Sequence, residues 1–203
     1  MTVVDLLGGM FGTRPVEVVA ALCGLINVTL IIRRSLWNYP FGFVMVTLYA
    51  WIFYQNNLYS DALLQVYFFI IQIFGVTWWL RGRDATGAII VRSLTTAQAL
   101  AWTLAAIIGV AALGLTMFGL TDAALPFWDA AVTVLSVVAQ TLMARRYVES
   151  WLVWIIVDAL AIGVFASKAL VPTAALYSIF LGLAIQGWFS WHSKMRPHGA
   201  ARA

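Results

Sequence analysis

The chain has 203 residues, of which 63% are hydrophobic and 10% are charged, and its formal net charge is +4. Soluble domains are about 45–50% apolar and about 25% charged, so this composition excludes a soluble globular protein and predicts an integral membrane protein. A basic excess would suggest nucleic-acid binding in a soluble protein. Here it is expected to reflect loop charges that orient the chain in a bilayer, with lipids as partners and no nucleic acid.

Long apolar segments follow one another along the whole chain. A helix that crosses a bilayer needs roughly 20 mostly apolar residues. Seven segments meet this requirement, in chain order residues 16–32, 36–54, 61–80, 97–118, 127–144, 150–167 and 173–191. Basic or turn-forming residues separate them. The sequence therefore predicts an all-α membrane protein with seven transmembrane helices.

The basic residues favour one side of the membrane. With seven spans, ten of the twelve Lys and Arg residues lie on the same side, and only Arg14 and Lys168 lie on the other. Because basic loops stay in the cytoplasm, the N-terminus is predicted outside and the C-terminus inside. The N-terminal segment has no basic region and no small-residue cleavage site before its first apolar run, so no removable signal peptide is expected.

The chain also contains an internal repeat. When it is aligned with itself, residues 17–79 fall on residues 129–191 without a gap. Identical residues in this register include Arg33/Arg145, Arg34/Arg146, Gly75/Gly187 and Trp79/Trp191. Because each copy has three helices, the helix between the copies is needed to make them parallel. Parallel repeats are a transporter architecture that binds its substrate between the two halves.

The expected organisation follows from this repeat. It comprises an outer N-terminal segment (1–15), the first three-helix repeat with a cytoplasmic loop (16–96), a linker helix (97–118), the second three-helix repeat (119–191) and a cytoplasmic tail (192–203).

A carboxyl group lies within the apolar segment 150–167. At about 100° per residue, Trp151, Trp154 and Asp158 share one helix face. An ionisable residue at membrane depth is a functional hypothesis by default. Lys168 lies about three turns away and cannot easily pair with Asp158. An acid beside indole faces suits a flat organic cation.

Polar side chains on three other predicted helices also form stripes. These stripes cannot face hydrocarbon, so they either join helices or line a cavity, and both alternatives remain open. The complete candidate substrate site is Trp151, Trp154, Asp158, Gln140, Ser136, Asn38, Tyr49, Gln65, Gln72 and Tyr177. Five further tryptophans near the predicted surfaces are expected in the interfacial belt: Trp37, Trp78, Trp79, Trp188 and Trp191. No metal site and no cofactor are expected.

Three stretches resemble the PnuC family of bacterial vitamin transporters, and the resemblance covers about residues 17–191: WNYPFGFVMVTLYAWIFYQNNLYSDALLQVYFF, PFWDAAVTVLSVVAQTLMARRYVESWLVW and LYSIFLGLAIQGWFSW. The resemblance implies a three-one-three arrangement of helices, similar to that of the SWEET sugar transporters. It implies facilitated diffusion of a vitamin across the bacterial inner membrane, made one-way by a cytoplasmic kinase that phosphorylates the substrate. The family's W-x-x-W pair, associated with riboside binding, matches Trp151 and Trp154.

Nicotinamide riboside is the substrate that the resemblance favours, and thiamine or riboflavin are the alternatives. Ser150 replaces an Asn that precedes the tryptophan pair in some members, so the particular vitamin is open. An intramembrane enzyme or a receptor is the rival class, but the chain has no P-loop, HExxH or GxSxG motif. A proton-coupled carrier would use Asp158, Asp129 or Glu149 as a relay. A homo-oligomer is possible.

Overall fold

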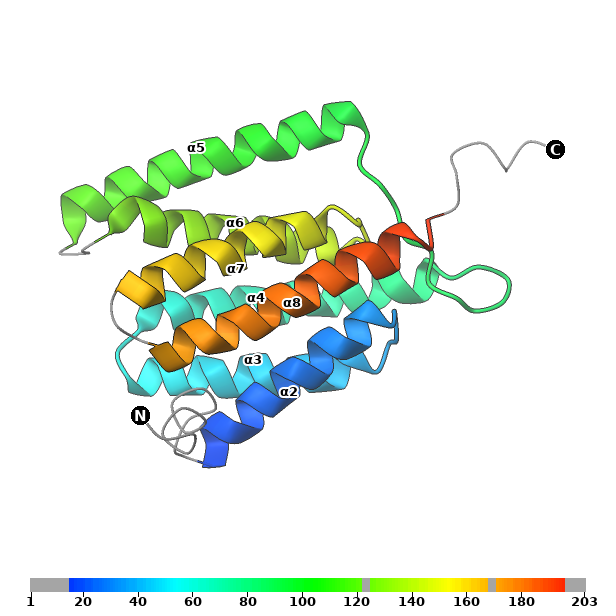
Figure 1. Cartoon of the computed structure of the whole chain (residues 1–203), viewed down its shortest axis with the longest axis horizontal. Helices are drawn as coiled ribbons and strands as arrows, with labels where there is room; N and C mark the ends of the chain where they lie inside the picture. The colour runs from blue at the N-terminus through cyan, green and yellow to red at the C-terminus, as the bar shows by residue number, and fades with distance from the viewer. Residues whose placement is uncertain (1–14, 122–124, 168–170, 196–203) are drawn as a thin grey trace.

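The structure is a computed structural model, and it describes residues 15–121, 125–167 and 171–195. Within these ranges the chain forms seven α-helices (Figure 1): α2 (Pro15–Ile32), α3 (Asn38–Gln55), α4 (Tyr59–Arg81), α5 (Thr96–Leu120), α6 (Pro126–Ala144), α7 (Ser150–Ser167) and α8 (Val171–His192). Each predicted helix end lies within two residues of the observed one. The predicted all-α membrane fold is confirmed.

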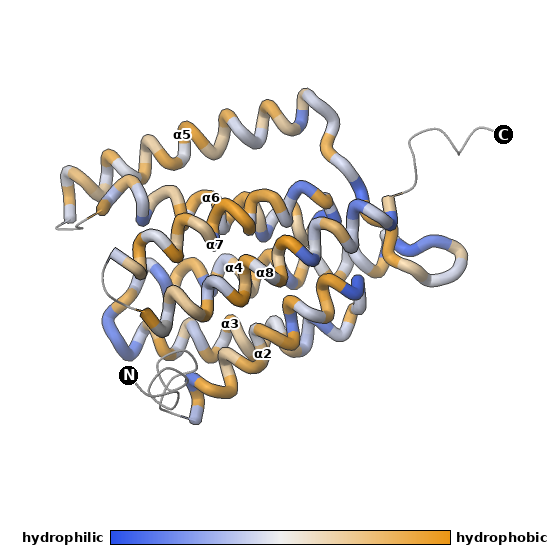
Figure 2. The backbone as a smooth tube through the Cα atoms, in the orientation of Figure 1, coloured by the Kyte–Doolittle hydropathy of each residue, from blue (hydrophilic) through white to orange (hydrophobic). Residues whose placement is uncertain are grey.

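Most of these helices are long and apolar enough to cross a membrane. Six of the seven described helices meet that criterion, and α3 is the exception. Its sequence is rich in aromatic residues and has polar residues at both ends, which lowers its mean hydropathy. Figure 2 shows hydrophobic residues along the length of the helices and many hydrophilic residues in the connecting turns. This distribution fits a bundle whose sides face lipid.

Six helices form a closed ring. Within the described residues, α2 packs on α3, α3 on α4, α4 on α6, α6 on α7, α7 on α8, and α8 returns to α2. The remaining helix, α5, packs on α6 alone and lies along one edge of the bundle (Figure 1). The ring therefore encloses an interior to which α5 contributes little.

The two halves of the ring are structural repeats. In the register that pairs residue 17 with residue 129, helices α2, α3 and α4 fall on α6, α7 and α8, with ends that agree within one residue. Arg34 and Arg146, a matched pair in this register, both have left-handed backbone conformations, with φ of 56° and 66°. Such a conformation is costly for an arginine, so its recurrence at matched positions supports the repeat. The outermost domain bounds extend beyond the described residues and stay a prediction.

One end of the bundle carries most of the arginines. The α2–α3, α4–α5 and α6–α7 connections and the C-terminus of α8 lie together at this end, on the right of Figure 1. We call it the basic end, after Arg33, Arg34, Arg81, Arg83, Arg92, Arg145 and Arg146. The α3–α4 turn and the start of α2 lie at the opposite end.

Candidate functional site

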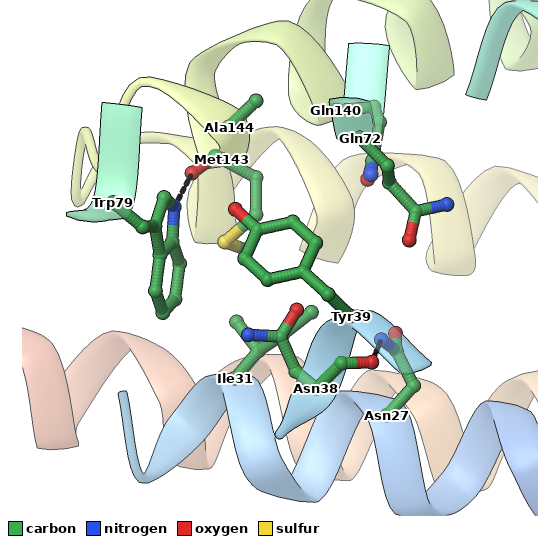
Figure 3. Close-up of a pocket in the computed structure, with 9 residues that line it drawn as sticks. All are labelled: Asn27, Ile31, Asn38, Tyr39, Gln72, Trp79, Gln140, Met143 and Ala144. Carbon is green, nitrogen blue, oxygen red and sulfur yellow. Dashed lines mark hydrogen bonds between the residues drawn. The ribbon is translucent and has the colours of Figure 1, made fainter. Parts of the chain in front are cut away.

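A small cavity lies inside the ring, in the half nearer the basic end. Its lining residues come from α2, α3, α4 and α6 (Figure 3) and are Asn27, Ile31, Asn38, Tyr39, Gln72, Trp79, Gln140, Met143 and Ala144. The cavity volume is about 20 Å³, which is room for about one water molecule. Pockets that bind drug-sized molecules measure about 300–1,000 Å³. Binding of a molecule of that size here therefore requires the helices to move apart.

One side of the cavity is made of amide side chains, which we call the amide cluster: Asn27, Asn38, Gln72 and Gln140. Asn27 Nδ2 donates a hydrogen bond to the carbonyl oxygen of Asn38 at 2.8 Å. Asn38 and Gln72 are only 3% and 4% exposed. Gly42 makes this packing possible, because a Cβ atom at that position would collide with Gln72 Oε1 and Asn27 Nδ2. Donors and acceptors thus converge inside an apolar bundle.

The second repeat reverses the side-chain sizes of the first. Positions 27, 42 and 72 carry asparagine, glycine and glutamine, whereas the matching positions of the second repeat carry Ala139, Trp154 and Ala184. Both alanines are buried, and the Trp154 ring meets Phe68 at 6.4 Å with an interplanar angle of 61°. The amides of the first repeat thus match alanines in the second, and the Trp154 indole fills a position where the first repeat has no side chain.

Trp151 does not line the cavity. It is 2% exposed and its ring packs edge-on against Trp191 at 5.5 Å and 88°. Its indole also covers Gly187, where a Cβ atom would collide with it. Its Nε1 atom has no hydrogen-bond partner among the described residues. These contacts give Trp151 a structural role. Its contact with substrate stays a prediction.

Asp158 lies near the middle of α7 and is 4% exposed. Tyr177 lies close enough to interact electrostatically with Asp158, Tyr49 and Asp61. In the described part of the chain, no basic side chain is paired with the Asp158 carboxyl group. A buried carboxylate without a partner is strongly destabilising, so this group is suited to a cationic guest or a proton.

The structure separates the predicted site residues into groups. Asn38, Gln72 and Gln140 line the cavity. Asp158, Tyr49 and Tyr177 form a second group, in which Tyr49 also stacks on Phe53 at 5.7 Å. Ser136 is buried on α6 and Gln65 is partly buried on α4, and neither lines the cavity.

Three polar or aromatic residues of the cavity were not predicted from the sequence: Asn27, Tyr39 and Trp79. The interpretation of Trp79 and Trp191 as belt residues is wrong, because they are 1% and 0% exposed in the core. Trp37, at 71% exposure, has the position expected of a belt residue. The signal for Trp79 was its match with Trp191 in the repeat. Two tryptophans that face lipid need not occupy matched positions of the repeats. Two tryptophans at the contact between the repeats are expected to do so.

A ring of two parallel three-helix repeats around a polar interior is the architecture of a membrane transporter. The chain belongs to the nicotinamide mononucleotide transporter family, which it matches over residues 14–193. It is 32% identical over 210 residues to the nicotinamide riboside transporter PnuC of Escherichia coli (strain K12), covering 91% of this chain and 88% of that one.

Other relatives agree on the class of protein. The chain is 30% identical to the riboflavin/roseoflavin transporter RibM of Streptomyces davaonensis, with 89% of this chain and 85% of that one covered. Among solved structures, the crystal structure of the vitamin B3 transporter PnuC matches with a TM-score of 0.73 and 27% identity. That match covers 94% of this chain and 88% of the other. The resemblance to PnuC transporters is confirmed.

Proposed function

We propose that this protein is a membrane carrier for nicotinamide riboside. The observation that carries the proposal is the amide cluster that lines the cavity, together with Trp154 and the buried Asp158, which lie one turn apart on α7. Nicotinamide riboside has a flat cationic ring, a carboxamide and a hydroxylated sugar. An indole attracts the cationic ring, an acid balances its charge, and amides bond the polar groups. The names of several relatives support the same substrate.

The charges in the interior favour the riboside over nicotinamide mononucleotide, the substrate in the family's name. A phosphate monoester carries about −1.5 to −2 charge at neutral pH. No Lys or Arg is among the residues that line the cavity, and Asp158 would repel the phosphate. The riboside lacks the phosphate and is a net cation.

Two other vitamins remain as alternatives. Riboflavin is favoured by the similarity to RibM, and its flat ring and sugar-like chain suit Trp154 and the amide cluster. It is neutral, however, so it gains nothing from Asp158. Thiamine carries a positive thiazolium ring that suits the acid, but it offers fewer hydroxyl groups to the amide cluster.

The proposal is tested by binding to purified protein in detergent, measured by calorimetry with four ligands side by side. Nicotinamide riboside should bind at least tenfold more tightly than the mononucleotide, because the phosphate meets an acid and finds no cation. Riboflavin and thiamine should bind more weakly than the riboside. Tighter binding of the mononucleotide would contradict the charge argument, and tighter binding of riboflavin would reassign the substrate.

The transport mode is part of the same proposal. The bias of the arginines favours a cytoplasmic basic end and an N-terminus outside. The riboside would cross by facilitated diffusion, and a cytoplasmic kinase would retain it by phosphorylation. We expect no enzymatic activity, in keeping with a family whose named relatives are transporters. Labelling of Arg33→Cys in intact cells by a membrane-impermeant thiol reagent would contradict this orientation.

A further inference from the structure

The two repeats are joined by a reciprocal pair of hydrogen bonds. Trp79 Nε1 on α4 donates to the carbonyl oxygen of Met143 on α6 at 3.4 Å, as Figure 3 shows. Trp191 Nε1 on α8 donates to the carbonyl oxygen of Ile31 on α2 at 3.1 Å. The two donors occupy matched positions of the repeats, and so do the two acceptors. The last helix of each repeat thus bonds to the first helix of the other.

The accepting carbonyls lie where two helices end. Ile31 and Met143 are in the last turns of α2 and α6, and each carbonyl also accepts the backbone N–H of the arginine three residues later. Carbonyls in a last helical turn lack the usual partner four residues ahead, so they can accept a side-chain donor. Moving the two repeats apart would break both indole bonds and leave the short turn bonds within each repeat intact.

Four aromatic side chains contact one another in a continuous series that includes both tryptophan donors. Trp79 and Trp191 lie with their centroids 5.9 Å apart. Tyr39 meets Trp79 edge-on at 5.7 Å and 85°, and Trp151 meets Trp191 in the same way at 5.5 Å and 88°. We call these four side chains the aromatic row. Tyr39 and Trp151 are also a matched pair of the repeats, so the row has the symmetry of the repeats.

The aromatic row is buried, and its neighbouring rings are in contact. Its members are between 0% and 6% exposed. Each outer ring is seated on a glycine, because a Cβ atom at Gly75 would collide with Tyr39 and one at Gly187 with Trp151. Tyr39 and Trp79 also form part of the cavity lining. Gln72 lies two turns before Trp79 on α4, farther from the basic end, so the row lies between this part of the cavity and the basic end.

We propose that the aromatic row is the gate of the basic end, and that Trp79 and Trp191 are its gating residues. The inference rests on the proposed carrier function. Opening separates α4 from α6 and α8 from α2 and breaks the two indole bonds together. The reciprocal arrangement makes both repeats contribute equally, so neither half opens alone.

The test measures access to the cavity without any substrate. In a Cys23→Ser background, Gln72→Cys places a thiol in the cavity lining. The rate at which a membrane-impermeant methanethiosulfonate reagent modifies this thiol is measured in vesicles that expose the basic end and in vesicles that expose the opposite end. Arg33→Cys marks the vesicles that expose the basic end. Trp79→Phe and Trp191→Phe each remove one donor, whereas Trp78→Phe is the matched control, since Trp78 lies outside the row and faces Arg145.

Each gate variant should raise the rate of modification from the basic end about fivefold, which is the ratio for one lost hydrogen bond. The double variant should raise the rate about 25-fold if the two bonds contribute independently, and the Trp78→Phe control should leave it unchanged. Rates equal to the control would overturn the gate, as would an increase seen only from the opposite end. Because no vitamin is used, this result is independent of the binding test above.

A second variant guards against misfolding. Replacement of Trp79 or Trp191 by 3-benzothienylalanine, introduced by nonsense suppression, keeps the two-ring shape and removes only the N–H donor. The same increase in rate is expected from it, with the melting temperature close to that of the parent protein. If only the phenylalanine variants are modified faster, packing and not the reciprocal pair of hydrogen bonds holds the row closed, and the proposal fails.

Discussion

A carboxylate buried in the apolar middle of α7 needs a proton, a cation or hydrogen-bond donors to stabilise it. Asp158 has Trp154 and Trp151 one and two turns earlier on its helix, and Tyr177 within electrostatic reach. None of these neighbours supplies a positive charge. A bound pyridinium ring would supply it in a site shielded from water, where charge pairing is stronger than at the surface.

Asp158→Asn keeps the shape and the hydrogen-bonding capacity of the side chain and removes its charge. We expect this variant to bind nicotinamide riboside at least tenfold more weakly, because a buried charge pair is lost. The reduced riboside, whose ring is neutral, should lose much less affinity. Both ligands are titrated into one folded preparation. Equal losses would show that Asp158 only bonds to a neighbouring helix.

Among the helices and loops, the α4–α5 connection is tied to both repeats. Arg34 Nη1 donates to the carbonyl of Ile89 at 3.2 Å, and Arg146 Nη1 donates to the carbonyl of Gly82 at 2.7 Å. Burial, and to a lesser extent the nearby Arg92, lower the pKa of Arg146. The two left-handed arginines thus hold one loop from opposite halves of the ring.

Glu149 fixes the end of the same loop. Its Oε1 atom accepts hydrogen bonds from Ser93 Oγ at 2.5 Å and from the backbone N–H of Leu94 at 3.0 Å. Both donors lie directly before α5. These contacts give Glu149 a structural role at the basic end, away from the cavity, and they argue against its use as a proton relay.

Glu149→Ala should therefore lower the free energy of unfolding by about 2–3 kcal/mol, the usual contribution of hydrogen bonds to a charged acceptor. Glu149→Gln is the matched control, since it retains an acceptor oxygen and should lose less than about 1 kcal/mol. Thermal unfolding in detergent measures both. Similar stabilities of the two variants would mean that the loop is held by the arginines alone.

For the whole molecule, the proposed carrier function rests on the two three-helix repeats that face each other across the ring. Movement of the two repeats against each other can expose a central site to either side in turn. We propose that the vitamin moves through this cycle by facilitated diffusion, without a coupled ion.

Uptake of nicotinamide riboside into empty proteoliposomes should therefore reach equal concentrations on both sides and then stop. An imposed proton or sodium gradient should change neither the plateau nor the direction of transport. A kinase with ATP enclosed in the vesicles should raise the total uptake without changing the initial rate. Accumulation of free riboside above the outside concentration would contradict facilitated diffusion.

The helices were predictable from sequence because apolar length and loop charge are strong signals in membrane proteins. The inward faces were harder to predict. A lipid-facing side and a packed side are both apolar, so the sequence of α4 does not distinguish the buried Trp79 from the partly exposed Trp78. Polar residues are a partial exception, because Asn38, Gln72 and Gln140 were found for their polarity although Asn27 was not. Tyr39 was missed because its surroundings depend on how the repeats pack.

The linker helix α5 has a consequence for how unlike the two halves can become. Two identical three-helix chains that paired as a homodimer would carry every substitution twice, once in each subunit. Joined in one chain by α5, the halves have diverged at matched positions, with Gly42 beside amides in one and Trp154 beside alanines in the other. A single polypeptide can thus present two different surfaces to one asymmetric molecule, with one end of that molecule reserved for each half.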